Sequence, residues 1–354
     1  MNTSVRIDSE TVNYLIGKVS NKLMVSREMV LPFVDFTDFM EALLRLLDNR
    51  DGRRLVAAGH VTPDVAMAAD RAHLDLKETL AVSPFTGDPD RTLEEISTGR
   101  EIIYVANPNR VTGANYSLAD LEMLARAVPE GTLMVDEHYY DFYGISGLPL
   151  LERHANIIVI RSLTTSFGIR SDESGYVVAS KDIINALKEA YSWDRISRMT
   201  YKILSTCLMN YEAMETRLKL LHDESLRIAL GLNRLKIQNR LTATDFLLLR
   251  VADPVRVGNY LASSRVQVEN LDGYPELKNY IRYDIQSELS NDIMINAFKR
   301  MPEAYYRMDN LDKRFIKMRK PGQGKKTETG AETDMTVFDR GRIEIREKET
   351  VEKV

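Results

Sequence analysis

The sequence predicts an α/β fold in which a mostly parallel sheet is covered by helices on both faces, with a smaller α+β domain after it. Short apolar runs alternate with amphipathic helical segments through the first half of the chain, and this alternation is typical of parallel sheets. A second set of strands and helices follows a long helical stretch at residues 182–235. A chain of 354 residues is long enough for both domains.

The elements follow from apolar periodicity and capping signals. Apolar residues at helical spacing predict helices within residues 8–47. In the large domain, strands are predicted at residues 53–58, 79–83, 101–113, 131–140, 156–163 and 175–180, the third and fourth ending in polar turns. Helices are predicted at 62–71, 91–97 and 117–128, with Pro63 in an opening turn and Ser117 as an N-cap. In the small domain, strands are predicted at 245–251, 266–270 and 280–285, and helices at 254–264 and 291–301.

These elements suggest four segments along the chain. We expect an N-terminal helical segment at 1–30, a large domain at 31–215, a small C-terminal domain at 216–318, and a polar linker and tail at 319–354. Gly, Lys, Thr and Glu dominate residues 320–334, a composition typical of linkers. The stretch at 336–348 either forms an edge hairpin or stays disordered.

Composition and charge argue against several classes of function. The net charge of −4 gives no reason to expect a nucleic-acid partner. Cys207 is the single cysteine, so an intramolecular disulfide and a cysteine-cluster metal site are excluded. No run approaches the roughly 18 apolar residues of a membrane span, and the first ten residues lack the apolar core of a signal peptide. We expect a cytoplasmic protein without a membrane or metal site.

Unusual residues follow three of the predicted strands, at 107–113, 136–139 and 162–168. Ligands of such sheets bind beyond the carboxyl ends of the strands. The sequence therefore predicts that these three segments meet in one crevice.

Four motifs occur in a particular order: N-P-N-R-V-T-G at 107–113, M-V-D-E-H-Y-Y-D-F at 134–142, R-S-L-T-T-S-F-G-I-R at 161–170, and L-K-N-Y-I-R-Y-D-I at 277–285. Together they resemble the fold-type I pyridoxal-phosphate enzymes, most closely the histidinol-phosphate aminotransferases, over about residues 39–301. The resemblance implies an aminotransferase scaffold and a homodimer with the active site at the interface.

The resemblance assigns roles to four residues that match the family pattern. Asp136 matches the aspartate that bonds the pyridinium nitrogen of the cofactor. Tyr139 matches a tyrosine that bonds the phenolic oxygen, and Ser162 a hydroxyl that contacts the phosphate. Arg282 matches the arginine that grips the substrate carboxylate. The alternatives are inherited packing for Asp136 and Tyr139, and a surface or interdomain ion pair for Arg282.

Other positions depart from the family pattern. Thr165 stands where the Schiff-base lysine belongs, and a hydroxyl cannot form an imine. Glu173 replaces an arginine that holds the phosphate, Arg110 replaces an asparagine that contacts the cofactor, and His138 replaces a small alanine under the pyridine ring. The usual phosphate-binding turn is also missing. From these departures we expect no pyridoxal-phosphate cofactor.

His138 has two interpretations. With Asp136 on the same strand end, it could be held as a general base. It could instead fill a pocket that the cofactor has left. The candidate catalytic residues are therefore Thr165, His138 and Asp136, the cofactor-contact positions are Asp136, Tyr139, Ser162, Glu173 and Arg110, and the substrate-binding residue is Arg282.

Three functions remain open at this point. The leading one is an aminotransferase-like protein that has lost transamination and binds a carboxylate or amino-acid-like ligand through Arg282, with or without different chemistry. The second is a genuine aminotransferase whose lysine is misplaced by the alignment, with Lys181 and Lys188 as the nearest later lysines. The third is a non-catalytic binding or regulatory homodimer.

Overall fold

The computed structural model describes residues 9–48, 53–169, 173–193 and 196–308, and it confirms the predicted α/β fold. The chain forms two compact units. The first comprises residues 1–218 and 242–245, and the second comprises residues 219–241 and 246–354. The tail expected at 319–354 lies outside the described residues, so its conformation stays a prediction.

A seven-stranded sheet forms the centre of the first unit, in the order β1-β7-β6-β5-β4-β2-β3. Its strands are β1 (Val30–Phe33), β2 (Leu55–Ala58), β3 (Leu76–Thr79), β4 (Ile102–Ala106), β5 (Thr132–Asp136), β6 (Ile157–Ser162) and β7 (Gly175–Val178). Strands β6, β5, β4, β2 and β3 run parallel, while β7 is antiparallel to both β6 and β1. The parallel strands therefore bring their carboxyl ends to one edge of the sheet.

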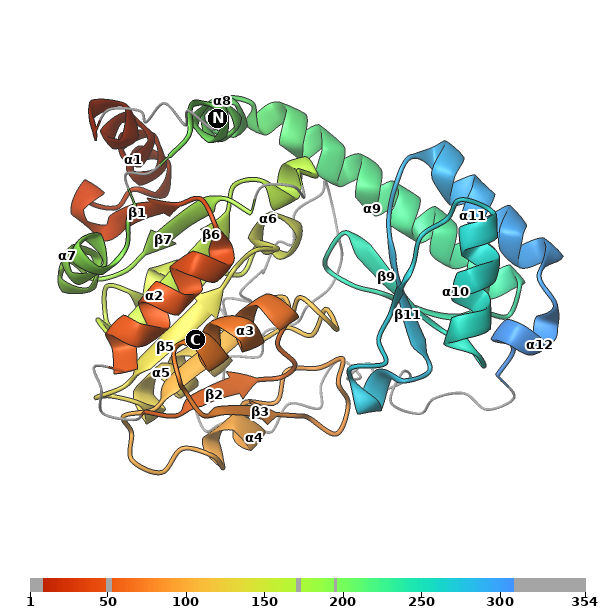
Figure 1. The fold of residues 1–354 in the computed structure, drawn as a ribbon, viewed down its shortest axis with the longest axis horizontal. Coiled ribbons are helices and arrows are strands. Elements are labelled where there is room, and N and C mark those ends of the chain that lie inside the picture. Colours follow the sequence, from red (N-terminus) through yellow and green to blue (C-terminus); the bar gives the residue numbers. More distant parts are fainter. Residues whose placement is uncertain (1–8, 49–52, 170–172, 194–195, 309–354) are drawn as a thin grey trace, which may run out of the picture. The chain divides into compact units, whose positions relative to one another are not determined.

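Helices cover both faces of this sheet (Figure 1). One face packs against α2 (Phe36–Asp48), α3 (Pro63–Arg71) and α7 (Lys181–Ala190). The opposite face packs against α4 (Pro89–Leu93) and α5 (Leu118–Ala127). The central strands are mostly apolar because both of their faces are buried, and their polar residues lie at the strand ends. Ser117 caps α5 through a capping box, as the sequence predicts.

A third apolar cluster joins α1 (Ser9–Leu23) and α8 (Arg198–Met209) to β1 and β7. The other elements of this unit are short: η1 (Arg27–Met29), α6 (Tyr140–Tyr143), η2 (Leu148–Leu150) and η3 (Thr165–Phe167). The long helix α9 (Tyr211–Arg234) begins in the first unit and ends in the second.

The second unit contains a four-stranded antiparallel sheet in the order β10-β11-β9-β8. Its elements are β8 (Gln238–Leu241), β9 (Phe246–Arg250), α10 (Pro254–Ser263), β10 (Glu269–Asn270), η4 (Pro275–Leu277), β11 (Tyr280–Asp284), α11 (Glu288–Arg300) and α12 (Glu303–Tyr306). The sequence predicts β9, α10, β11 and α11. Strand β8 is not predicted because its residues Q-N-R-L are mostly polar and none is fully buried.

The prediction is wrong in three places in the first unit. Residues 8–47 are not helical throughout, because β1 lies between α1 and α2. Its four buried residues include Pro32, which is tolerated because β1 is an edge strand. Strand β3 ends at Thr79, where the sequence predicts its start, because the edge strand uses the polar run L-K-E-T. Helix α4 begins at Pro89, two residues before the predicted helix at 91–97.

A buried ion pair joins β5 to β6 on the face opposite α2. Arg161 Nε donates to Glu137 Oε2 at 2.8 Å, and the backbone N–H of Gly147 donates to Glu137 Oε1 at 2.7 Å. Burial raises the pKa of Glu137, although Arg161 opposes this shift. The guanidinium of Arg161 also lies 3.5 Å from the centre of the Tyr140 ring. This pair fixes the segment directly after Asp136.

Gly175 shows how closely the strands at this edge approach one another. A Cβ atom there would lie 2.0 Å from the Arg161 carbonyl oxygen and 2.7 Å from Phe33 Cζ. The Arg161 backbone and the packed Phe33 ring cannot shift without a large cost in free energy. Only glycine therefore fits at this position of β7, which lies between β1 and β6.

We expect Gly175→Ala to lower the free energy of unfolding by roughly 1–3 kcal/mol, the typical cost of overpacking a core. Urea unfolding followed by circular dichroism measures the effect. Gly258→Ala in α10 is the control: its Cβ would meet atoms no closer than 3.8 Å, and removing a helical glycine stabilises by about 0.5–1 kcal/mol. Equal effects of the two substitutions would contradict the packing argument.

Candidate functional site

The candidate site lies where β4, β5 and β6 end at the same edge of the parallel sheet. Asp136 is the last residue of β5 and is fully buried. The loop after β4 is held by its own asparagines. Asn107 Oδ1 accepts from the Tyr116 backbone N–H at 2.9 Å, and Asn109 Nδ2 donates to the His60 carbonyl oxygen at 2.8 Å. This loop carries Arg110 to the end of β5.

Both carboxylate oxygens of Asp136 are hydrogen-bonded. The Tyr104 hydroxyl donates to Oδ2 at 2.5 Å. The His138 backbone N–H donates to Oδ1 at 3.1 Å, and the same oxygen is bonded to His138 Nδ1. Arg110 Nη1 lies 3.9 Å from Oδ2. The carboxylate is thus surrounded by donors and by one guanidinium.

Arg110 is shared among three carboxylates. Its Nη1 donates to Asp64 Oδ2 at 2.9 Å and lies near Asp136, while its Nη2 donates to Glu173 Oε1 at 3.3 Å. Its guanidinium carbon lies 4.9 Å from the centre of the Phe36 ring. Burial would lower the pKa of Arg110, but the nearby carboxylates raise it, so the guanidinium stays charged. Glu173 is therefore not an isolated negative charge.

The charges in this cluster decide the protonation state of Asp136. Burial alone would raise its pKa, but His138 and Arg110 together with the Tyr104 hydrogen bond hold the pKa at about 2. The same burial and the neighbouring carboxylate raise the pKa of the Tyr104 hydroxyl. Asp136 is ionised and Tyr104 is protonated at neutral pH.

His138 is held on two sides. Asp136 bonds Nδ1, and the Phe36 ring meets the imidazole edge-on with the ring centres 4.6 Å apart. The residue is 3% exposed. Its Nε2 is buried and has no hydrogen-bond partner in the part of the chain that the structure describes.

Ser162 and Thr165 form a separate group in the loop after β6. The Ser162 hydroxyl oxygen accepts from the Thr165 backbone N–H at 3.0 Å and from the Thr165 hydroxyl at 2.9 Å. The next residue, Ser166, donates to Asp141 Oδ2 at 2.6 Å. Gly168 ends the turn with a φ of 74°, a conformation that favours glycine. Arg217 of α9 also donates to the Ser166 carbonyl oxygen at 2.8 Å, so this loop is bonded to both α6 and α9.

The remaining predicted residues are Tyr139 and Arg282. Tyr139 is buried before α6, and its ring meets Phe142 edge-on at 5.5 Å. Arg282 belongs to the second unit. Its Nε donates to Asp284 Oδ1 at 2.9 Å, and its guanidinium carbon lies 3.9 Å from the centre of the Phe246 ring. The structure thus brings Asp136, His138, Arg110 and Glu173 together and places Ser162 with Thr165.

The sequence analysis missed three members of the Asp136 group: Tyr104, Asp64 and Phe36. A tyrosine within the apolar strand I-I-Y-V-A was the available signal for Tyr104. Asp64 and Phe36 sit in the first turns of α3 and α2, and no local pattern separates them from ordinary helix starts.

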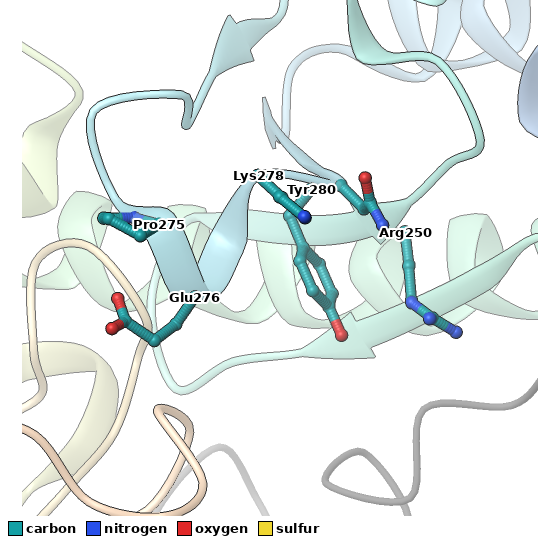
Figure 2. A pocket seen from close by; sticks show the side chains of 6 residues that line it. Arg250, Pro275, Glu276, Lys278 and Tyr280 are labelled. Atoms are coloured by element: carbon teal, nitrogen blue, oxygen red, sulfur yellow. The ribbon is translucent and has the colours of Figure 1, made fainter.

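Two cavities lie outside the Asp136 group. One of about 220 Å³ in the second unit is lined by Arg250, Pro275, Glu276, Lys278, Asn279 and Tyr280 (Figure 2). Arg282 is not among these residues. The other, of about 30 Å³ in the first unit, has Ser162, Arg161 and Lys22 among its lining residues and has room for about one water molecule.

The described residues contain no group of three or more His, Cys, Asp and Glu side chains that could hold a metal ion. Likewise, none of the helices within them is long and apolar enough to span a bilayer.

Lys181 and Lys188, the alternative positions for a Schiff-base lysine, lie in α7. Lys181 is exposed and forms an ion pair with Glu28.

Comparison with known proteins identifies a family. The family model described as aminotransferase class I and II matches residues 15–293. Histidinol-phosphate aminotransferase 2 of Legionella pneumophila is 28% identical over 204 residues, which cover 56% of this chain and 55% of that protein. Histidinol-phosphate aminotransferase of Neisseria meningitidis is 26% identical over 274 residues, covering 75% and 73%. The chain thus matches little more than half of the Legionella protein.

Solved structures share the fold. The histidinol-phosphate aminotransferase of Clostridium acetobutylicum matches with a TM-score of 0.73 at 16% identity, over 83% of this chain and 90% of that one. The enzyme from Sinorhizobium meliloti, in complex with pyridoxal-5'-phosphate, matches with a TM-score of 0.73 at 16% identity, over 82% and 81%.

These findings contradict the expectation that the chain takes no cofactor. The matching family is one of aminotransferases, and the Sinorhizobium structure carries pyridoxal-5'-phosphate. The error has a physical reason. Replacing a lysine removes one covalent bond, whereas ring and phosphate contacts are non-covalent and do not depend on it. The presence of Glu173 in place of an arginine also argues less strongly against the cofactor than expected, because Arg110 pairs with the Glu173 carboxylate.

We expect folding stability to fall in a defined pH window because of Asp136. Its folded pKa of about 2 lies below the ordinary value of 3.8, so the ionised group stabilises the fold above about pH 4. This contribution is lost as the pH falls from about 4 to about 2 and amounts to roughly 2 kcal/mol. Urea unfolding of the unaltered protein and of Asp136→Asn, compared at pH 6 and pH 3, measures it. An equal difference between the two proteins at both pH values would contradict the assignment.

Proposed function

Because the chain belongs to the family of class I and II aminotransferases, we propose that it is a histidinol-phosphate aminotransferase-like protein that has lost transamination through a lysine-bound cofactor. In this proposal it binds a carboxylate or amino-acid-like ligand. The observation that carries the proposal is Thr165. It occupies the loop after β6, where the resemblance puts the Schiff-base lysine, and its hydroxyl donates to Ser162 Oγ at 2.9 Å.

The chemical reason is the difference between an amine and a hydroxyl. A lysine amine condenses with an aldehyde to an imine with loss of water, whereas a threonine hydroxyl has no nitrogen to form that bond. Thr165 also has a hydrogen-bond acceptor within its own loop. The residue therefore fits a structural role in the turn and does not fit covalent attachment.

Pyridoxal phosphate remains the cofactor expected for a member of this family. Asp136 is an ionised buried carboxylate, which is the charge that favours a protonated ring nitrogen. The Arg110 guanidinium is already paired with Asp64 and Glu173 and does not serve as a phosphate contact in our proposal. When bound, the cofactor supplies an electron sink. In our proposal it is held without a covalent bond.

Arg282 is the proposed carboxylate-binding residue. Its side chain is 13% exposed and is oriented by Asp284 and the Phe246 ring. A guanidinium held in this way can present a planar fork to a carboxylate. The homodimer implied by the resemblance also stays part of this proposal.

We expect the unaltered protein to give no adduct on a single lysine after incubation with pyridoxal phosphate and borohydride reduction, because the amine at position 165 is absent. Thr165→Lys should give close to one equivalent of reduced adduct on the introduced lysine. Mass analysis of peptides locates the adduct. Thr86→Lys, at an exposed site outside the Asp136 group, is the control for non-specific reaction. Close to one equivalent of reduced adduct on Lys181, Lys188 or another lysine of the unaltered protein would contradict the proposal. The alternative of a genuine aminotransferase would then be favoured.

Arg282→Lys should weaken the binding of L-glutamate about tenfold, since an ammonium cannot reproduce the two-point contact of a guanidinium. Isothermal titration calorimetry measures the dissociation constant. Arg256→Lys is the matched control in the same unit, because Arg256 is 65% exposed and lies in α10. Equal affinities of all three proteins, or no binding by any, would count against Arg282 as the carboxylate-binding residue.

A further inference from the structure

The cavity at one end of the second unit's sheet has room for a ligand (Figure 2). Its volume is about 220 Å³, and its lining residues are Arg250, Pro275, Glu276, Lys278, Asn279 and Tyr280. A water molecule takes up about 30 Å³ of the liquid, so the cavity has room for roughly seven waters. Drug-sized ligands need about 300–1,000 Å³. The cavity therefore suits a smaller compound, about the size of an amino acid.

The fold fixes the backbone around this cavity. Arg250 ends β9 and pairs in register with Tyr280, the first residue of β11. Paired residues of neighbouring strands share one face of a sheet, and Figure 2 shows these two side chains pointing the same way. The Val251 N–H donates to the Asn279 carbonyl oxygen at 2.9 Å and closes this end of the sheet. Leu277 anchors η4 because its side chain is fully buried.

The lining carries more positive than negative charge, although the whole chain has a net charge of −4. Arg250 and Lys278 are cations, and Glu276 is the one acid among the six lining residues. Arg250 Nη1 donates to Gln238 Oε1 at 3.1 Å. Because this amide is neutral, the bond orients the guanidinium without cancelling its charge. The excess of positive charge favours an anionic ligand.

Two side chains of the lining have no protein partner. Within the described residues, neither the Lys278 ammonium nor the Asn279 side-chain amide forms a hydrogen bond or ion pair. An ammonium offers three hydrogen-bond donors and an amide offers two. These donors match a ligand that accepts hydrogen bonds, as a carboxylate does.

We propose that this cavity binds an acidic amino acid. Arg250 binds one carboxylate of the ligand, Lys278 and Asn279 bind the other, and Glu276 binds the ammonium group. The charges match in number, because two cations meet two carboxylates and one acid meets one ammonium. Arg282 does not line the cavity. The site is therefore separate from the carboxylate-binding residue of the proposed function and does not depend on it.

Lysine-methyl NMR of the full chain tests the inference at the site itself. Reductive methylation with carbon-13 formaldehyde labels the lysines and keeps their positive charge, and Lys278→Gln identifies the signals of Lys278. Addition of L-aspartate should shift these signals until the site is saturated. Lys299 is the control, because it is an exposed lysine of α11 in the same unit. Its signals, identified with Lys299→Gln, should stay in place.

A comparison of two ligands tests the role of Glu276. Succinate has two carboxylates but no ammonium group. Titrations that follow the Lys278 signals should therefore show L-aspartate binding about tenfold more tightly than succinate, the ratio expected for one hydrogen bond between charged groups. Glu276→Gln should remove this preference. Asp272→Asn should keep it, because Asp272 is an exposed acid of the same loop that does not line the cavity.

The outcomes separate this site from the proposed function. Unmoved Lys278 signals, equal affinities for L-aspartate and succinate, or tighter binding of inorganic phosphate would overturn the inference. Arg282→Lys should leave the response of Lys278 to L-aspartate unchanged, and loss of the response in that variant would assign the ligand to Arg282 and overturn the separate site. A reduced pyridoxal-phosphate adduct on a native lysine would contradict the proposed function only.

Discussion

The buried carboxylate of Asp136 is the feature on which the candidate site depends. It lies at the end of a central parallel strand, where three loops meet, and burial of an ion there is tolerated only if its charge is met. Tyr104, His138 and Arg110 meet it from β4, from the loop after β5 and from the loop after β4. Loss of the carboxylate would remove the group that all three partners contact.

Charge pairing extends outwards from this point. Arg110 is bonded to Asp64 and Glu173, so a residue in the first turn of α3 and a residue just before β7 are tied to the end of β5. The residue directly after β5, Glu137, is paired with Arg161 on the opposite face. Successive strand residues point to opposite faces, so two adjacent acids anchor both sides of the same strand end. The charged side chains of the site are therefore positioned by residues at the ends of the sheet strands.

His138 changes how a ligand would meet this charge. The small residue expected at that position by resemblance would leave the carboxylate open to the ring of a cofactor. An imidazole there places one nitrogen on Asp136 and leaves the other buried without a hydrogen-bond partner among the described residues. Thr165 has no amine to form a covalent bond, whereas His138 occupies space beside Asp136 that a small residue would leave free. The two positions therefore differ in separate physical respects and can be varied separately.

Local periodicity and short motifs are enough to predict the alternation of strands and helices, the parallel sheet, and the position of Asp136, His138 and Ser162 at strand ends. The folded structure was needed to show that β1 is an edge strand and that Tyr104, Asp64 and Phe36 belong to the Asp136 group. The Arg110 and Asp64 partners are 46 residues apart, so no local pattern can pair them. The sequence shows Glu173 as an acid in place of the expected arginine, and the structure shows this acid bonded to Arg110. A sequence gives the sign of each charge, but the fold decides which charges pair.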